Sequence, residues 1–341
     1  MMRVFAFAAA VVLVLLPALA DNYVLRVATT MLMYSALALG WNFIGGFAGY
    51  PSFATAAFFG LGAYASGVLQ TMGVPMPAAW ALGGAIVALF AAALGRAILH
   101  LRGHYFAIAS LVVAEVLREI TNSATDLTGG GMGLNLPVLS LDVTNQARLF
   151  YYAMFVAAAA ALATTAFVAH NRLGFGLRCI QQNEDAAIML GINTLRYKVV
   201  AFVLSAVFPG VCGGIYASWV NYIDPTDVYD VLLSVKPIVM VLLGGVGTVM
   251  GGVYGAILFL LMEELVWRNL LQFHAGLLGI IVVCLVLFLP NGLRGAGWAK
   301  PWWRRGPERR RHDRHAAARQ RIPPLRRPDR RQQRFVRIAG G

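Results

Sequence analysis

The chain has 341 residues, of which 59% are hydrophobic and 13% are charged, whereas about a quarter of the residues in soluble domains are charged. This composition excludes most soluble enzymes. The net charge of +13 does not indicate nucleic-acid binding, because residues 1–290 hold 12 basic and 12 acidic side chains and the excess lies in residues 291–341. Cys179, Cys212 and Cys284 form no C-x-x-C motif, which excludes a disulfide framework and a zinc ribbon.

Long apolar runs predict helices that cross a membrane. Residues 27–95 contain no charged side chain over 69 positions, which is enough for three crossings at about 20 residues each. The two-residue alternation of a membrane β-barrel is missing, so the predicted fold class is all-α and polytopic. In chain order, the predicted helices span residues 4–20, 27–44, 53–71, 78–95, 103–120, 148–169, 197–220, 232–246, 249–266 and 274–289.

Basic residues mark the segments predicted to lie in the cytoplasm. Segment 170–198 and the tail 291–341 are rich in Lys and Arg, whereas 121–147 and 221–233 contain neither. The positive-inside rule therefore predicts a cytoplasmic loop at 170–198 and periplasmic loops at 121–147 and 221–233. The tail has 14 arginines after Lys300, and we expect it to be disordered in the cytoplasm.

The parity of the crossings decides how many helices are predicted. If both termini lie in the cytoplasm, the number of crossings must be even. About ten crossings result only if the stretch 232–266 divides into two at the glycines within 244–247, which break a helix. An alternative exists at the N-terminus, where Arg3, an apolar run and the small residues 18–20 also resemble a cleaved signal peptide. We predict a transmembrane domain at 1–290, with nine crossings if cleavage occurs.

Glycines at helical spacing predict close helix packing. Gly247, Gly251 and Gly255 recur every four residues in the predicted helix 249–266 and just before it. Small residues four positions apart let the backbones of membrane helices approach closely. We therefore predict a tight helix–helix seam here, either within the chain or across a dimer.

Three charged residues share one face of the predicted helix 103–120. Glu115, Arg118 and Glu119 lie at positions i, i+3 and i+4. Charges inside a membrane are costly and usually face a bundle interior or a water-filled path. They are therefore either a self-neutralising cluster near the outer interface or part of a translocation path.

A glycine-rich loop follows this helix. Thr128, Gly129 and Gly130 lie within residues 127–134, a stretch with four glycines. Its backbone amides would form a nest for an anion or a carboxylate, and a flexible loop is the alternative. We include these three residues in the predicted translocation path.

Motifs of known catalytic sites are missing or incomplete. None of the three lysines follows a glycine, so the phosphate-binding P-loop is excluded, and no G-x-S-x-G nucleophile elbow occurs. His100 and His104 lie four residues apart without an obvious third metal ligand. Spaced aspartates at 224, 227 and 230 resemble those that hold Mg²⁺ and diphosphate in membrane transferases, but a solvated loop is the preferred interpretation. We predict no catalytic residue, no metal and no cofactor bound by this chain.

The most informative polar segment is 173–191. Asn183 is suited to cap a short helix with Glu184 and Asp185 in its first turn, and Gly191 is suited to end it. A short capped helix between two membrane spans is either built to dock onto another protein or an ordinary connection.

These residues also carry a resemblance to a known family. The stretch Asp185-Ala-Ala-x-x-x-Gly191 resembles the EAA-x-x-x-G coupling segment of ABC importer permeases. Further segments resemble, in order, the permeases of branched-chain amino-acid uptake systems: 39–49, 57–64, 102–108, 128–130, 178–205 and 241–247. The resemblance covers about residues 1–295 and assigns ATPase coupling to Arg178, Asn183, Glu184, Asp185, Ala186, Ala187 and Gly191.

The resemblance implies a permease subunit in a bacterial inner membrane that moves branched-chain amino acids inward by alternating access. Its implied partners are a second permease, two cytoplasmic ATPases that bind ATP and Mg²⁺, and a periplasmic binding protein. Departures from the family pattern at 51–55 and at Gly131 and Met132 leave urea, short amides and carboxylates open as substrates. Two alternatives remain: a proton-coupled secondary transporter that uses Glu115, Arg118 and Glu119, and an intramembrane transferase that uses Asp224, Asp227 and Asp230.

Overall fold

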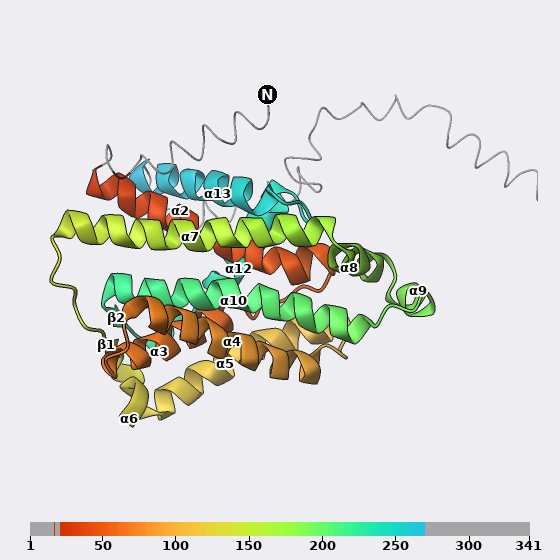
Figure 1. Cartoon of the computed structure of the whole chain (residues 1–341), viewed down its shortest axis with the longest axis horizontal. Helices are drawn as coiled ribbons and strands as arrows, with labels where there is room; N and C mark the ends of the chain where they lie inside the picture. The colour runs from red at the N-terminus through yellow and green to blue at the C-terminus, as the bar shows by residue number, and fades with distance from the viewer. Residues whose placement is uncertain (1–16, 18–20, 270–341) are drawn as a thin grey trace, which may run out of the picture. The chain divides into compact units, whose positions relative to one another are not determined.

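The computed structural model of the protein describes residue 17 and residues 21–269 (Figure 1). The longer helices are α2 (Asn22–Trp41), α3 (Thr55–Thr71), α4 (Met76–Ile98), α5 (His104–Ser123), α7 (Val143–His170), α10 (Thr194–Val220), α12 (Leu232–Gly244) and α13 (Gly251–Asn269). The shorter elements are a π-helix η1 (Asn42–Phe47), α6 (Thr125–Thr128), a 3₁₀ turn η2 (Gly130–Met132), α8 (Arg172–Gln182), α9 (Glu184–Met189), α11 (Pro225–Val228) and two strands, β1 (Leu134–Asn135) and β2 (Tyr222–Ile223).

The all-α prediction is confirmed for the described part of the chain. Its two strands are two residues long and pair antiparallel, with Leu134 opposite Ile223. The predicted helices at 4–20 and 274–289, the domain boundary at 290 and the basic tail lie outside the described residues. The number of ten crossings therefore stays a prediction.

Four of the described helical segments are long and apolar enough to cross a membrane: Asn22–Phe47, Met76–Ile98, Val143–His170 and Thr194–Val220. They differ in burial: 72% of an apolar 18-residue window is buried in the segment made by α2 and η1, whereas 33% of such a window is buried in α4 and in α7. The outward faces of α4 and α7 carry exposed apolar side chains such as Leu89, Val156 and Phe167. Such faces suit lipid, so α2 lies inside the bundle and α4 and α7 lie at its periphery.

The core of the bundle forms where α10 packs against α3 and α4. Glycines permit this close approach: a Cβ atom on Gly62 of α3 would overlap the backbone of Gly210, and one on Gly213 of α10 would overlap the backbone of Phe59. The buried rings of Phe58 of α3 and Phe202 of α10 also meet edge to face, with centroids 5.2 Å apart. The bundle is thus held by backbone proximity and aromatic packing together.

The stretch 232–266 divides as predicted. Helix α12 ends at Gly244, α13 begins at Gly251, and Gly245 and Gly247 between them have positive φ angles of 113° and 69°. Left-handed backbone at two positions is compatible with a sharp turn and not with a continuous helix.

The predicted glycine seam is correct for two of its three members. A Cβ atom on Gly255 would overlap the Met240 carbonyl of α12, and one on Gly251 would overlap the Gly245 carbonyl directly after α12, so the seam lies within the chain. Gly247 lies in the turn before α13 and packs against η1 instead of α12: it donates its N–H to the Asn42 Oδ1 at 2.9 Å, and a Cβ atom on it would lie 3.1 Å from the Gly46 carbonyl. The Asn42 Nδ2 donates in turn to the carbonyl of Thr248 at 2.9 Å, which ties the turn to η1.

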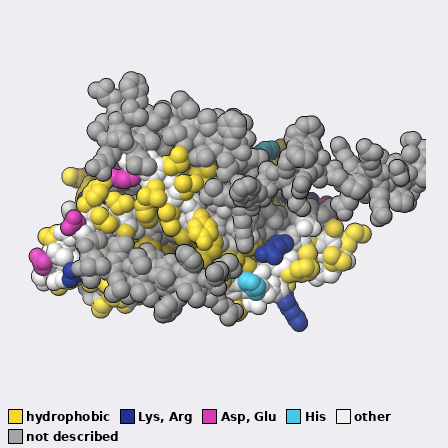
Figure 2. Space-filling model, turned by 90° about the horizontal axis from the view of Figure 1, so that it is seen from above, with side chains coloured by type: hydrophobic (Ala, Val, Ile, Leu, Met, Phe, Trp, Pro, Cys, Tyr) yellow, Lys and Arg dark blue, Asp and Glu magenta, His cyan; other side chains and the backbone are white. Residues whose placement is uncertain are grey.

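The two sets of connecting segments lie at opposite ends of the bundle. Figure 1 shows α8 and α9 at one end and α6, β1 and β2 at the other. In Figure 2, hydrophobic side chains form a broad patch on the visible face, acidic ones lie toward one end, and basic ones lie mostly toward the other. This distribution matches a helical bundle whose two ends meet different aqueous compartments.

Candidate functional site

The segment between α7 and α10 folds into the short capped helix that the sequence predicts. The Asn183 Oδ1 accepts a hydrogen bond from the backbone N–H of Ala186 at 3.0 Å, which caps α9 at its N-terminus. At the other end Gly191 has a φ of +81°, and the N–H groups of Gly191 and Ile192 return to carbonyls of α9. A left-handed glycine after the last turn is a common way to end a helix.

A buried lysine holds this helix against the bundle. Lys198 lies in the second turn of α10 and is 3% exposed. Its Nζ donates to the Glu184 Oε1 at 2.7 Å, to the Leu99 carbonyl at 2.9 Å and to the Tyr50 hydroxyl at 3.1 Å. Because an ammonium has three N–H donors, the hydrogen-bonding capacity of Lys198 is fully used.

The remaining oxygens of Glu184 and its neighbour are also held. The Tyr50 hydroxyl donates to the Glu184 Oε2, and the Arg102 Nε lies 3.6 Å from the same oxygen. The Arg102 guanidinium also pairs with the Asp185 Oδ1 at 3.0 Å. The first turn of α9 is therefore bound by residues that follow η1, that connect α4 to α5, and that begin α10.

The electrostatics of this network favour an ionised glutamate. Burial by itself raises the pKa of Glu184, but hydrogen bonds from Lys198 and Tyr50 and the positive charges of Lys198 and Arg102 outweigh it, so its pKa lies below the usual value. Burial and the adjacent Glu184 carboxylate raise the pKa of Tyr50. The pKa of Arg102 is raised by its hydrogen bond to Asp185 and by the nearby carboxylates. Glu184 is therefore ionised at neutral pH.

The opposite side of α9 is apolar and exposed. Ala187 faces the bundle and is 1% exposed, whereas Ile188, Met189 and Leu190 are 50%, 90% and 76% exposed. A helix fixed along one side that presents consecutive apolar side chains to solvent is suited to bind another protein. We call Ile188, Met189 and Leu190 the apolar tip.

The predicted coupling residues take different positions around this helix. Asn183, Glu184, Asp185 and Gly191 shape and hold α9, as described above, and Ala186 and Ala187 lie in its middle. Arg178 belongs to α8, where its guanidinium lies 5.6 Å from the centre of the Phe47 ring and links α8 to η1. Arg178 therefore contacts the bundle and does not belong to the apolar tip, which lies further along the chain.

Sequence reasoning missed the partners of Glu184. Tyr50 and Leu99 lie far from Glu184 in sequence, and Lys198 is one of several basic residues in the predicted cytoplasmic loop 170–198. One signal in the sequence could have identified Lys198, because a lysine inside a stretch that is otherwise apolar requires a partner once it is buried.

Two of the three charged residues predicted on one face of α5 form an ion pair. Arg118 and Glu115 form an ion pair, and the Glu115 side chain is 61% exposed. Glu119 is exposed on the same helix, and Val112 and Val116 are exposed beside it. The Nε of Arg118 is buried and has no hydrogen-bond partner among the described residues. The face therefore mixes charge with apolar surface.

The glycine-rich loop is a packed turn. The Thr128 hydroxyl donates to the carbonyl of Thr121 at 2.7 Å and accepts the N–H of Gly130 at 3.2 Å. The N–H of Gly129 donates to the carbonyl of Thr125. The prediction of an anion nest is wrong for Gly129 and Gly130, because these amides are used within the loop.

The spaced aspartates also have local roles. The Asp224 Oδ1 caps α11 by accepting the N–H groups of Thr226 at 2.7 Å and Asp227 at 3.1 Å. The Asp230 Oδ1 accepts the N–H of Leu232 at 2.9 Å ahead of α12. These contacts favour the interpretation of residues 224–230 as a structured loop.

Comparisons with known proteins agree over most of the chain. Residues 23–289 match the family described as branched-chain amino acid transport system / permease component. The high-affinity branched-chain amino acid transport system permease protein LivM of Escherichia coli K12 is 25% identical over 318 residues, which cover 85% of this chain and 74% of LivM. The corresponding protein LivH of Salmonella typhimurium is 24% identical over 285 residues, which cover 77% of this chain and 91% of LivH.

A third relative is more distant. The probable branched-chain amino acid transport permease protein LivM of Methanocaldococcus jannaschii is 22% identical over 208 residues, which cover 57% of this chain and 60% of that protein. No solved structure matches the chain.

Proposed function

Because this chain belongs to the branched-chain amino acid transport permease family, we propose that it is the membrane subunit of an ATP-driven importer of branched-chain amino acids. It acts in a bacterial inner membrane, with the end of the bundle that carries α9 in the cytoplasm. A second permease, two cytoplasmic ATPases and a periplasmic binding protein complete the importer. ATP and Mg²⁺ bind to the ATPases, and the helices of this chain undergo the movement that alternates access between the two sides of the membrane.

The observation that carries the proposal is the apolar tip on a helix that is firmly held. We assign Ile188, Met189 and Leu190 to the contact with an ATPase, because they are exposed together at the end of a helix whose other side is bound to the bundle. Burial of such side chains on binding contributes about 25 cal/mol for each Å² of apolar surface. The fixed geometry of α9 reduces the entropy that is lost on docking.

The network at Glu184 gives a route for force from α9 to the membrane helices. Lys198 joins Glu184 to α10 and to the carbonyl of Leu99 at the end of α4. The Tyr50 ring packs edge to face on Phe106 of α5, with centroids 5.5 Å apart. A displacement of α9 is thereby passed to α4, α5 and α10 together, as alternating access by rigid-body movement requires.

We also propose that the charged face of α5 borders the translocation path, opposite the second permease. Exposed carboxylates on a membrane helix are costly next to lipid, so Glu115 and Glu119 require water or protein beside them. The exposed residues Val112 and Val116 on the same helix suit contact with a second subunit. Thr128, Gly129 and Gly130 shape the loop at the outer end of this helix.

A substitution in the apolar tip tests the proposal. We expect Met189→Glu to abolish co-purification of the ATPases and amino-acid uptake, while the protein stays in the membrane. The matched control is Met72→Glu, because Met72 is 66% exposed but lies in the turn after α3, away from α9. Uptake and co-purification that are unchanged in Met189→Glu would contradict the docking role.

A further inference from the structure

A stripe of exposed side chains runs along the outer face of α4. Positions 82, 86, 89, 93, 96 and 100 follow one another at alternating spacings of four and three residues, and all six side chains are exposed. Residues at these spacings share one face of a helix. We call this set the α4 stripe, and its members are Leu82, Ile86, Leu89, Ala93, Arg96 and His100.

Most of the α4 stripe suits lipid acyl chains. Leu82, Ile86 and Leu89 are 48%, 42% and 73% exposed. Helix α4 has 23 residues, and at 1.5 Å a residue it is long enough to cross a hydrocarbon layer of about 30 Å. The apolar members of the stripe therefore lie at hydrocarbon depth, and its last two members, Arg96 and His100, reach the membrane interface.

The guanidinium of Arg96 is available to an anion. Its Nη1 donates to the Ala92 carbonyl at 3.2 Å, and no carboxylate of the described residues lies within 4 Å of it. Because a guanidinium has five N–H donors, most of them remain for a ligand. The His100 side chain is exposed in the turn after α4 and has no hydrogen-bond partner in the described part of the chain.

The turn that carries His100 is held in place by the network around α9. The carbonyl of Leu99, directly before it, accepts the Lys198 Nζ at 2.9 Å. Arg102, in the same connection between α4 and α5, pairs with carboxylates of α9. A group bound by Arg96 and His100 therefore lies beside the turn that anchors α9.

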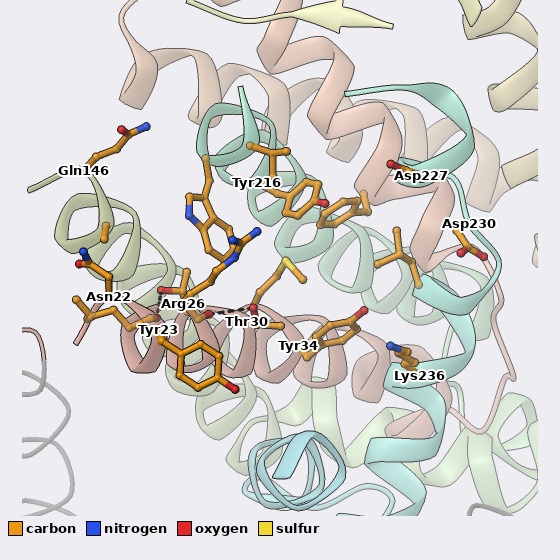
Figure 3. A pocket seen from close by; sticks show the side chains of 18 of the residues that line it. Asn22, Tyr23, Arg26, Thr30, Tyr34, Gln146, Tyr216, Asp227, Asp230 and Lys236 are labelled. Carbon is orange, nitrogen blue, oxygen red and sulfur yellow. Dashed lines mark hydrogen bonds between the residues drawn. The ribbon is translucent and has the colours of Figure 1, made fainter. Parts of the chain in front are cut away.

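Basic side chains at the opposite end of the bundle have acidic neighbours. A pocket of about 890 Å³ opens there between α2, α7, α10 and α12 (Figure 3). Arg26 and Lys236 line it together with Asp227 and Asp230, and carboxylates in the same pocket repel an anionic ligand. Helix α4 and its connection to α5 contain no acidic residue. The α4 stripe thus differs from this pocket in favouring a negative charge.

We propose that the α4 stripe binds an anionic phospholipid whose phosphate contacts Arg96 and His100. An acyl chain of the same lipid lies along Ile86, Leu89 and Ala93, because one leaflet has about 15 Å of hydrocarbon, or about ten residues of helix. An arginine donates two parallel hydrogen bonds to phosphate oxygens, and a ring N–H of His100 adds another. The bound lipid stabilises the turn between α4 and α5. This inference requires only that the chain spans a membrane and is independent of the transported substrate.

Native mass spectrometry of the purified full chain tests the assignment. The protein is titrated with phosphatidylglycerol or phosphatidylcholine of identical acyl chains, which share the phosphate and differ in net charge, and the affinity for the first bound lipid is measured. We expect phosphatidylglycerol to bind at least about fivefold more tightly, since one arginine near a membrane surface contributes about this factor toward anionic lipid. Equal affinities for the two lipids overturn the proposal.

Variants locate the headgroup. Arg96→Gln is expected to lower the affinity for phosphatidylglycerol about fivefold and to leave that for phosphatidylcholine unchanged. Arg96→Lys keeps the charge and is expected to keep the preference, which separates loss of charge from misfolding. The matched control is Arg196→Gln, because Arg196 is exposed in the first turn of α10, outside the α4 stripe. An equal loss in both glutamine variants, or no loss in Arg96→Gln, overturns a site on α4.

Photocrosslinking in the membrane identifies what covers the stripe in the complete assembly. The probe is phosphatidylglycerol with a diazirine in its acyl chain, and cross-linked peptides are located by mass spectrometry. We expect cross-links within residues 86–93. Cross-links elsewhere on the chain but none in α4 mean that another subunit covers this face, which overturns the proposal.

A soluble headgroup separates a lipid site from a phosphate site. Glycerol 3-phosphate carries the phosphate without acyl chains, so we expect millimolar concentrations to leave the bound phosphatidylglycerol in place. Displacement of the lipid by glycerol 3-phosphate overturns the role of the apolar members of the stripe and with it the lipid assignment.

Discussion

Replacement of Lys198 by methionine tests whether the buried network stabilises the protein. Methionine has a side chain of similar length and fits an apolar site, so the change removes the charge and three hydrogen bonds with little change in packing. Glu184 keeps the hydroxyl of Tyr50 and the guanidinium of Arg102, whose Nε lies 3.6 Å from its carboxylate. The Leu99 carbonyl loses the Lys198 donor.

The expected loss follows from these contacts. Removal of one partner from a fully buried ion pair costs about 3–5 kcal/mol. The remaining cation, Arg102, has a side chain that is 57% exposed, so it compensates only part of the lost charge. We therefore expect Lys198→Met to lower the free energy of unfolding by about 2–3 kcal/mol.

Unfolding in mixed micelles titrated with SDS, followed by circular dichroism, measures this loss. Arg196→Met is the matched control, because Arg196 is exposed one half-turn earlier in α10, and we expect a change within about 0.5 kcal/mol. Adding Glu184→Gln to Lys198→Met removes the uncompensated carboxylate and is expected to recover part of the stability. A loss below about 1 kcal/mol, or a double variant less stable than Lys198→Met, would refute the reasoning.

Three further predictions concern backbone and pH. Gly255→Ala is expected to lower the free energy of unfolding by about 2 kcal/mol or more, because its Cβ would overlap the backbone of α12. Gly131→Ala is the control in the same SDS titration, because the nearest atom to its Cβ would be the Asn122 Oδ1 at 4.0 Å. Gly191→Val strains a left-handed backbone by about 1–2 kcal/mol, so uptake is expected to fall while membrane insertion persists, and Gly191→Asn is expected to retain uptake because asparagine tolerates this conformation. The pKa of Glu184 is lowered in the folded state, so its contribution to stability is present above the ordinary glutamate pKa and is lost as the pH falls through the lowered one. Thermal unfolding measured between pH 7 and pH 3, about the range in which carboxylates titrate, is expected to show a weaker dependence on pH in Glu184→Gln than in the wild type; equal dependence would contradict the assignment.

Local patterns in the sequence were sufficient to place the longer described helices and the short helix α9. The predicted helix 53–71 corresponds to α3 at Thr55–Thr71, and the glycines at 244–247 divide α12 from α13 as predicted. Two boundaries differ from the prediction because the helix continues through a charge or a pair of glycines, at Arg148 in α7 and at Gly45 and Gly46 in η1. Helix α7 begins at Val143 instead of residue 148, and the predicted helix 27–44 continues as a π-helix to Phe47.

Spacing alone gave a wrong position for one glycine. Gly247 lies four residues before Gly251, as a member of the seam would, but its positive φ places it in the turn. A periodic spacing predicts which residues would share a helix face, but it does not predict where the helix begins. The cap at Asn183 could be predicted because its hydrogen bond spans three residues.

The sequence by itself determined the class of the protein, its helical segments, the short capped helix and the family to which these belong, because each depends on residues that are neighbours along the chain. Only the tertiary structure decided that Lys198 pairs with Glu184, that Tyr50 joins them, and that Arg26 and Asp227 face one pocket. These residues are brought together by the packing of α2, α10 and their neighbours. Packing depends on which helix faces meet, and that arrangement is not encoded in the spacing of any single segment.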